Sequence, residues 1–534
     1  MKKFIISLAL FTLLVGCDDN ILNTVPVNEL NSELFWRSTN DAISAANAVY
    51  SFMPGIGEIQ WDMMSDIGHT NNPADFRQAI EKGEHDSTLG FFGSLWNSHY
   101  QAIRRANYFL ENVDQVLDND PVYTEELNKR LKAEVRTIRA MMYMRLSFFF
   151  GDVPLITNTI SPDEAALVSE TSREAITDFI SVELSEAASD LPLSYSGANI
   201  GRITRGAALS LKARALIYNN RWQEAAIAAE QVIDLGVYEL NESFESLFGY
   251  SAQNSSEIIL DRQYSRGSLS QNFFIAYGPQ GMNGNVGISP TGKLADSYQT
   301  INGLSIFEDP EFDEMNPFHN RDPRLQYTLF LPTFSDDVPG DVLYNGVLYD
   351  PRPGSGTGDE IERDLNRTKT GFNTKKYINM DDLSDPGNNG TNFILIRYAD
   401  VLLMYAEAKI ELNQIDNTVY EAINKVRARQ DVNMPPITGS LSQGELREVV
   451  RNERMTELAM EGLRFWDIRR WRIAEDVMVG NIPGMRYIRS GETEIQHFIF
   501  GGTTRAFNPN RDYLFPKPAQ ELIINPNLRQ NTGY

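Results

Sequence analysis

The sequence predicts an all-α protein, in which tetratricopeptide-like pairs of helices form a scaffold that carries a large loop-rich region with a few short strands. The first observation is residues 201–236, where a helix rich in small side chains and a second, alanine-rich helix are joined by a short turn. A similar pair is expected at 396–414 and 418–430. Small side chains let two helices pack closely, and a helical pair of about 34 residues is the unit of a tetratricopeptide repeat. Such units stack on one another, so the helices should form a curved frame.

The N-terminal two fifths of the chain is expected to extend this helical frame. Within residues 171–190, apolar residues recur at steps of three and four, as they do on one face of a helix. Ser172 can cap the start of that helix, and Pro192 follows its end. The frame should therefore occupy about 33–236 and 393–476. Its other N-terminal helices are expected at about 33–52, 94–117 and 123–150.

Three stretches interrupt the frame and change the composition of the chain. They are rich in Gly, Asn, Asp, Pro and aromatic residues, and their hydrophobic periodicity is weak. Loops of this length in a folded protein are more often functional than idle. We therefore expect them to form the ligand face of a single domain that spans 33–534. The stretches lie at about 55–93, 237–392 and 477–515.

The N-terminus has the pattern of a bacterial lipoprotein signal. Two lysines precede an apolar run at 4–15, which is too short to span a bilayer. The run ends in a Leu-Val-Gly-Cys sequence that resembles a lipobox and closes at Cys17, the only cysteine of the chain. We expect residues 1–16 to be removed, Cys17 to carry the lipid, and 17–32 to act as a tether. A secreted protein with an unmodified cysteine in its signal is the alternative.

The overall charge argues against nucleic acid as a partner. The net charge is −24, with 42% hydrophobic and 22% charged residues, which is typical of a globular protein. Such a surface repels phosphate backbones and offers no basic stripe to hold them. Solubility of a secreted surface protein explains most of the acidity.

A row of three glutamates is the strongest charged constellation. Glu453, Glu457 and Glu461 are spaced four residues apart, which places them on one helix face. Paired carboxylates can carry out glycoside hydrolysis, but they must then flank the scissile bond in a cleft. Ion pairing with arginines is the favoured interpretation, because a row along one helix does not flank a cleft. The candidate partners are Arg454, Arg464 and Arg470.

Other signatures of enzymes and metal sites are absent from the sequence. The five histidines show no HExxH or His-x-His spacing, which argues against zinc. The chain contains no phosphate-binding glycine loop and no G-x-S-x-G motif. The acidic run at 308–314 could offer oxygen ligands to calcium, but it lacks the EF-hand spacing, and a solvated loop is the favoured interpretation. We therefore predict neither an enzyme nor a bound cofactor or metal.

Several segments follow one another in a recognisable order along the mature chain. They are ELFWRSTNDAISAANAVY (33–50), LWNSHYQAIRRANYFLENV (95–113), EVRTIRAMMYMRLSFFFGDVPLIT (134–157), GRITRGAALSLKARALIY (201–218), LADSYQTINGLS (294–305), NRDPRL (320–325), TGFNTKKY (370–377), FILIRYADVLLMYAEA (393–408), INKVRAR (423–429), RNERMTELAMEGLRFWDIRRW (451–471) and LFPKPAQELIINPNLRQNTGY (514–534). In sequence and order they resemble the SusD/RagB family of nutrient-uptake outer-membrane lipoproteins. The chain departs from the family pattern at Thr532, where Pro is usual, and at 515–518, where the family more often has an Ile between the prolines.

The resemblance implies a function as well as a fold. It implies a lipid-anchored protein of the outer membrane, facing outside, that captures oligo- or polysaccharide and delivers it to a SusC-like TonB-dependent transporter. Acidic residues directly after Cys17 resemble the surface-export signal of Bacteroidetes lipoproteins. Three alternatives stay open: a peptide-binding member of the same family, a scaffold without a small ligand and, least favoured, a glycoside hydrolase.

Aromatic and polar residues in the loops are the candidate ligand contacts. A sugar ring stacks on Trp or Tyr, while Asp, Asn and Arg bind its hydroxyl groups. In glycan-binding members of the family that the chain resembles, contacts come from the first loop and the mid-chain loop. Core packing is the alternative for each aromatic residue and is favoured for Trp96, whereas Trp61, Phe274 and Tyr277 are expected to be exposed. The candidates are Trp61, Asp66, Asp75, Arg77, Trp96, Tyr264, Phe274, Tyr277 and Asn283.

Overall fold

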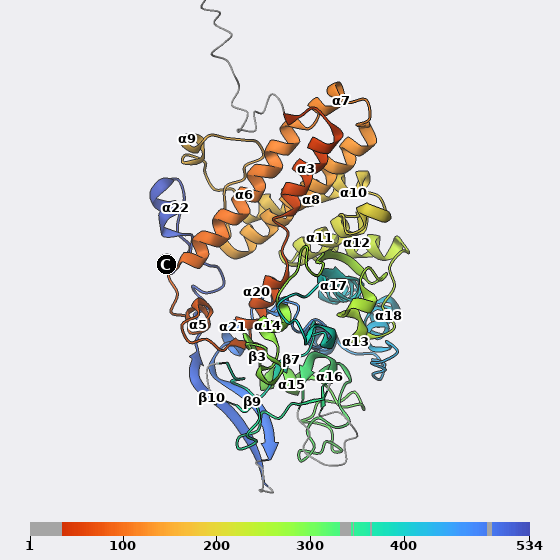
Figure 1. Ribbon diagram of the computed structural model, residues 1–534, viewed down its shortest axis with the longest axis vertical. Helices are drawn as coiled ribbons and strands as arrows, with labels where there is room; N and C mark the ends of the chain where they lie inside the picture. Colours follow the sequence, from red (N-terminus) through yellow and green to blue (C-terminus); the bar gives the residue numbers. More distant parts are fainter. Residues whose placement is uncertain (1–34, 332–342, 345, 362, 364–365, 489–493) are drawn as a thin grey trace, which may run out of the picture.

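The computed structural model is dominated by helices, and its described part contains five sheets of two strands each (Figure 1). The predicted all-α class with a few short strands is confirmed. None of the described helices is long and apolar enough to cross a membrane. The expected signal peptide, the lipidation site Cys17 and the tether lie outside the described residues. These residues are 35–331, 343–344, 346–361, 363, 366–488 and 494–534.

Packed helices from the N-terminal part form the upper half of the molecule in Figure 1. They are α3 (Thr39–Tyr50), α6 (Gly90–Asn112), α7 (Gln115–Asn119), α8 (Glu125–Phe150), α9 (Pro162–Ala165), α10 (Arg173–Asp190), α11 (Arg205–Ile217) and α12 (Trp222–Asp234). Side chains of Ser38, Thr124, Ser172 and Thr204 each accept a backbone hydrogen bond at the start of a helix. Helix α8 packs against α6 and α10, α10 against α11, and α11 against α12. The helical pair predicted at 201–236 is therefore present.

The second predicted pair is α17 (Tyr398–Glu411) and α18 (Asn417–Arg427). Helix α17 packs against α12, so the two pairs stack on one another as predicted. The strand β8 (Phe393–Arg397) occupies the residues just before α17, so this helix begins two residues later than expected. Helices α19 (Gln443–Glu457) and α20 (Arg464–Arg470) follow, and α19 packs against α17.

The loop-rich region lies in the lower half of Figure 1 and has a hydrophobic core of its own. Phe273, Tyr298 and Phe372 are buried in this core, which is separate from the core of the helical frame. Buried apolar surface therefore holds these loops in place. The short helices of the loops and the C-terminal part are η2 (Ile56–Ile59), α4 (Gln60–Met63), α5 (Phe76–Glu81), η3 (Gly197–Asn199), α13 (Phe244–Leu247), η4 (Tyr250–Ala252), α14 (Phe273–Tyr277), η5 (Gln280–Met282), α15 (Gly292–Ser297), α16 (Arg324–Thr328), η6 (Met380–Asp382), α21 (Ala474–Val477) and α22 (Ala519–Ile524).

Antiparallel strand pairs connect distant parts of the loop-rich region. They are β1 (Gly68–Thr70) with β3 (Ile288–Pro290), β2 (Ile258–Arg262) with β8, β4 (Leu329–Phe330) with β7 (Asn373–Thr374), β5 (Leu343–Tyr344) with β6 (Val347–Leu348), and β9 (Gly480–Ile488) with β10 (Ile495–Arg505). The β9–β10 pair is long and lies in the stretch predicted as loop at 477–515. Buried and more exposed residues alternate along the second half of β9, as in a strand with one covered face.

Buried ion pairs join the loop-rich region to helix α19. Glu457 is fully buried, and its carboxylate accepts hydrogen bonds from Arg397 at 2.7 Å and Arg429 at 3.0 Å. Arg324 from α16 donates to Glu457 at 2.9 Å and also to Glu453. Burial alone would raise the pKa of Glu457, but the three guanidinium groups hold that pKa well below its usual range.

The predicted ion pairing of the glutamate row is therefore right, but its predicted partners are wrong. The predicted shared helix face holds only for Glu453 and Glu457, because α19 ends at Glu457 and Glu461 lies in the turn that follows. Glu461 binds Arg397 and Lys376. The candidate partners lie on a different face of α19 or on α20 and bind other acids. Arg454 pairs with Asp400 and Asp467, Arg464 with Asp66, and Arg470 with Glu407.

We expect Glu457→Ala to lower the free energy of unfolding by about 3–5 kcal/mol, because it leaves buried arginines without their counter-charge. The measurement is a urea or thermal unfolding curve of the purified protein. Glu421→Ala is the matched control: Glu421 is exposed on α18 and has no ion-pair partner among the described residues. The control should change stability by about 0.5 kcal/mol at most. Equal stability of the two variants would contradict the structural role of the network.

Candidate functional site

Strands β1 and β3 bring two distant loops to one place on the molecule. Thr70 of β1 pairs with Ile288 of β3. The chain that leaves β1 runs through 71–75 into α5, and the chain that enters β3 comes from α14 through 278–287. The first loop and the mid-chain loop, the two regions indicated by the sequence, are therefore neighbours.

A polar groove of about 300 Å³ opens at this junction. Three of the predicted ligand contacts, Asp75, Arg77 and Tyr277, line it together. We call it the junction groove. Its other lining residues are Met63, Thr70, Asn71, Asn72, Asn285, Val286, Gly287 and Asn366.

Asp75 and Arg77 form an ion pair on one wall of the junction groove. Asp75 caps the start of α5, and its Oδ1 accepts a hydrogen bond from the backbone N–H of Arg77 at 2.9 Å. The Arg77 guanidinium donates to Asp75 Oδ2 and, at 3.3 Å, to Gln60 Oε1. It also lies over the ring of Phe76. Both charged side chains are partly exposed, so the pair is held in place and remains accessible.

Tyr277 supplies the aromatic surface of the junction groove. Its half-buried ring packs edge-on against Phe273, with 4.8 Å between ring centroids. Gly287 lies directly beside the ring, since an added Cβ there would sit 3.1 Å from Tyr277 Cδ1. The Tyr277 hydroxyl group has no hydrogen-bond partner among the described residues. Burial raises the pKa of the phenol, and Arg77 lowers it in part, so the hydroxyl group is a neutral donor and acceptor.

Asparagine side chains supply further polar groups. Asn71 is buried and already engaged, since its Nδ2 donates to Arg367 O at 2.6 Å and its Oδ1 accepts from the Ser289 hydroxyl group. Asn72 and Asn285 are exposed. The Asn72 Oδ1 accepts a hydrogen bond from Ala74 N–H within its own loop. The side-chain amide of Asn285 has no partner in the described part of the chain. Asn285 is thus free to bind a ligand hydroxyl group.

The loop before β3 has a tightly constrained backbone. An added Cβ at Gly284 would lie 2.0 Å from Gly278 O, so only glycine fits there. Val286 has a φ of 49°, which is unusual for a β-branched residue. Asn285 was not among the predicted contacts. Its signal in the sequence is the Asn-Gly-Asn run at 283–285, which marks a turn but does not show which amide faces the groove.

Two aromatic residues that were expected at the surface are buried, and that prediction is wrong. Trp61 is 0% exposed, and its ring stacks on Phe149 at 4.6 Å and contacts Phe465 at 5.1 Å. Phe274 is 1% exposed and belongs to the core of the loop-rich region. Both lie on short helices, α4 and α14, whose apolar side chains are buried.

Asp66 is also buried, and its prediction as a ligand contact is wrong. Arg464 donates to both of its carboxylate oxygens, at 2.8 and 2.9 Å, and Lys293 lies 3.0 Å away. Burial alone would raise the pKa of Asp66, but these two cations hold it well below its usual range. Asp66 therefore connects the first loop to α20.

The remaining three candidates do not line the junction groove. Trp96 is 4% exposed and packs against Phe150. Tyr264 is half-buried, and its hydroxyl group accepts a hydrogen bond from Ile56 N–H at 3.4 Å. Asn283 is exposed at the end of η5, in the left-handed region with a φ of 65°. Within the described ranges, no group of three or more His, Cys, Asp or Glu side chains could hold a metal ion.

Comparison with known proteins identifies the family. Residues 245–534 match the model of the SusD family. The chain belongs to the SusD family. Residues 34–217 match a second model, described as starch-binding and associating with the outer membrane.

The similar proteins cover nearly the whole length of this chain. A solved SusD-like carbohydrate-binding protein from Bacteroides fragilis is 30% identical, with a TM-score of 0.83, and covers 93% of this chain and 100% of its own. SusD-like protein P2 from Formosa agariphila is 27% identical over 100% of both chains. A laminarin-binding SusD-like protein shares the fold, with 23% identity and a TM-score of 0.68, over 93% of this chain and 100% of its own.

Family membership confirms the resemblance found in the sequence, the helical fold and the prediction of a binding protein rather than an enzyme. Carbohydrate binding and association with the outer membrane are properties at the level of the family.

We expect Trp61→Ala to lower the free energy of unfolding by about 3–5 kcal/mol, because it leaves a large cavity in a ring cluster. Thermal unfolding of the purified protein measures this change. Phe307→Ala is the matched control, since Phe307 is 74% exposed and its loss should change stability by about 0.5 kcal/mol at most. A stable Trp61→Ala protein with altered ligand binding would instead return Trp61 to the candidate contacts.

Proposed function

We propose that this SusD-family protein is a surface-exposed lipoprotein that captures an oligosaccharide in the junction groove and delivers it to a SusC-like TonB-dependent transporter. The observation that carries the proposal is the groove itself, where the Tyr277 ring lies beside the Asp75–Arg77 pair at the meeting point of two loops. Binding requires no covalent chemistry, so no catalytic residue is assigned.

The chemistry of the junction groove suits a neutral sugar. A pyranose ring has apolar C–H faces that pack on an aromatic ring, and hydroxyl groups that need donors and acceptors at its edge. Tyr277 offers the aromatic ring, while Asp75, Arg77 and the side-chain amide of Asn285 offer the hydrogen-bond donors and acceptors. The charges of Asp75 and Arg77 already balance each other, so an uncharged ligand leaves no charge unpaired.

The similar proteins support the same class of ligand. The Bacteroides fragilis protein is described as carbohydrate-binding, and another structural relative as laminarin-binding. Delivery to a transporter and an outward orientation are supported by the family as a whole and by the second family model, described as associating with the outer membrane. The peptide and scaffold alternatives are decided by the binding experiment below.

We expect Tyr277→Ala to weaken binding of the preferred oligosaccharide by about tenfold, which corresponds to about 1.4 kcal/mol. The wild type is first screened against a panel of neutral oligosaccharides that includes laminari-oligosaccharides, and affinities are then measured by isothermal titration calorimetry. Tyr277→Phe keeps the ring and should retain most of the affinity. Tyr108→Ala, at an exposed tyrosine of α6, should have no effect.

Two outcomes would contradict this proposal. Unchanged affinity of Tyr277→Ala would remove the junction groove from the binding site. A wild-type protein that binds none of the oligosaccharides at millimolar concentration would also contradict it: binding of members of a peptide library through Tyr277 would then replace the sugar by a peptide, and binding of neither would favour the scaffold.

We expect Cys17→Ser to abolish membrane attachment, because a lipid on Cys17 would be the anchor. The measurement is the distribution of the full-length protein between membrane and soluble fractions of the producing bacterium, together with incorporation of labelled palmitate. The wild type should be labelled and found with the outer membrane. An equally labelled, membrane-bound Cys17→Ser protein would show that another feature attaches the chain.

A further inference from the structure

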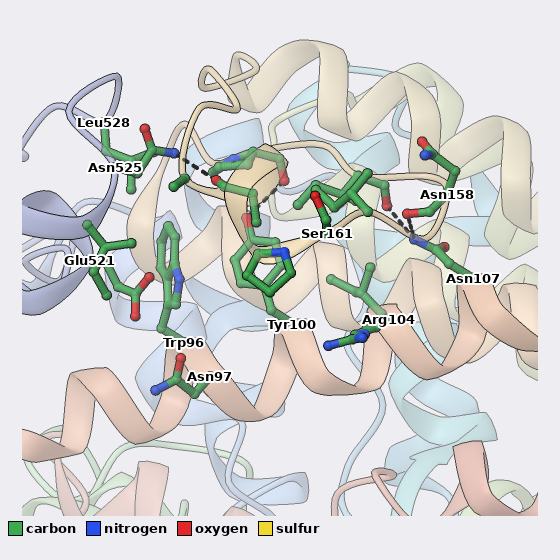
Figure 2. Close-up of a pocket in the computed structure, with 18 residues that line it drawn as sticks. Trp96, Asn97, Tyr100, Arg104, Asn107, Asn158, Ser161, Glu521, Asn525 and Leu528 are labelled. Atoms are coloured by element: carbon green, nitrogen blue, oxygen red, sulfur yellow. Dashed lines mark hydrogen bonds between the residues drawn. The ribbon is translucent and has the colours of Figure 1, made fainter. Parts of the chain in front are cut away.

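A second cleft lies on the helical frame, where α6, α9 and α22 meet (Figure 2). Its volume is about 330 Å³. We call it the α6 cleft. Asparagine side chains hold its walls together. Asn525 Nδ2 donates to Val168 O at 2.8 Å, and Asn107 Nδ2 donates to Ile156 O at 3.0 Å. The cleft is thus a built feature of the frame, and the candidate contact Trp96 lies in its wall.

The walls of the α6 cleft are mostly apolar. Ile156, Ile160 and Leu528 line it together with the rings of Trp96 and Tyr100. The Tyr100 hydroxyl group is already used, since it donates to Pro154 O at 2.9 Å. Around the cleft, apolar side chains are exposed to solvent. They are Leu167 at 66%, Ile523 at 75% and Ile524 at 50%. Exposed apolar surface gathered around a hollow is typical of a binding site.

Two opposite charges stand at the cleft without a counter-charge. Glu521 on α22 and Arg104 on α6 both line it, and neither has an ion-pair partner in the part of the chain that the structure describes. Glu521 is half-buried, and burial raises the pKa of its carboxyl group. Asn97 is exposed at the same cleft, and its amide has no partner within the described ranges either. A ligand could therefore satisfy a carboxylate, a guanidinium and an amide.

The length of the cleft wall along α6, from Trp96 beside Glu521 to Arg104, sets the length of such a ligand. Figure 2 shows Glu521 beside Trp96, with Tyr100 between Trp96 and Arg104. Trp96, Tyr100 and Arg104 follow one another at four-residue steps on α6, so the first and last are about 12 Å apart along the helix axis. An extended peptide spans about 3.3–3.6 Å per residue, so three residues cover about this distance.

We propose that the α6 cleft binds a short peptide with apolar side chains, whose amino end pairs with Glu521 and whose carboxyl end pairs with Arg104. Its apolar side chains occupy the cleft beside Trp96 and Tyr100, and Asn97 binds one of its peptide groups. A neutral sugar would leave both charges unpaired, and a fatty acid would place a carboxylate near only one of them. This site is separate from the junction groove and does not depend on the proposed function of that groove.

Isothermal titration calorimetry of the full-length mature protein with tri-leucine tests the proposal. Glu521→Gln and Arg104→Gln should each weaken binding about tenfold, because each removes one charged hydrogen bond. N-acetyl-tri-leucine amide lacks both terminal charges, so it should bind at least tenfold more weakly and be insensitive to either substitution. Arg105→Gln is the matched control, since Arg105 is exposed on the same helix but does not line the cleft.

The outcomes separate this site from the junction groove. Tyr277→Ala should leave tri-leucine binding unchanged, and Glu521→Gln should leave oligosaccharide binding unchanged. Equal affinity for the free and the blocked peptide would overturn the proposal, as would the absence of any tri-leucine binding at millimolar concentration. All the substituted side chains are partly or fully exposed, so a loss of binding can be checked against an unchanged melting temperature.

Discussion

The buried ion pairs of helix α19 are the constraint on which the arrangement of this molecule depends. Glu457 lies among Arg324, Arg397 and Arg429, which come from three different segments of the chain. A buried carboxylate is stable only when its counter-charges are present with good geometry, so each partner must adopt one position. Arg324 belongs to the loop-rich region, whereas Arg397 and Arg429 belong to the helical frame, so the pairs that Arg324 makes with α19 fix the loop-rich region on the frame. Replacement of a whole buried network by apolar residues of similar volume is often neutral in stability, whereas removal of one partner alone is costly.

The shape of the junction groove depends on buried ion pairs and hydrogen bonds of the same kind. Asp66 binds Arg464 on α20, and the backbone N–H groups of Gly462 and Arg464 donate to Asp62 at 2.8 and 3.1 Å. The first loop is thereby attached to the segment that follows α19, and β1 is held where β3 can pair with it. Asp75, Arg77 and Tyr277 then lie together at the surface, and the fold does not depend on them. The residues that position the groove and those that line it are therefore different.

The sequence predicted the frame well because the frame follows local rules. Small residues at helical spacing and capping hydroxyl groups depend on neighbours in sequence, and both helical pairs were found where expected. The strand pair β9–β10 and the partners of Glu457 depend on residues far apart in sequence, and both were missed. Trp61 is fully buried in a ring cluster with Phe149, Phe465 and Phe515, whereas Tyr277 packs against Phe273 and stays half-buried. The three ring partners of Trp61 are remote in sequence, so no local pattern could distinguish the two aromatic residues.

The two clefts differ in whether their charges are already balanced. In the junction groove, Asp75 and Arg77 both lie at the start of α5 and neutralise each other. A ligand there meets dipoles and no net charge. In the α6 cleft, Glu521 and Arg104 stand on different helices and apart from each other, so a bound ligand must supply both counter-charges. Desolvation of an unpaired charge opposes binding of any ligand that cannot pair with it. This difference in charge balance is the reason that we propose an uncharged sugar for the first cleft and a zwitterionic peptide for the second, even though aromatic rings line both.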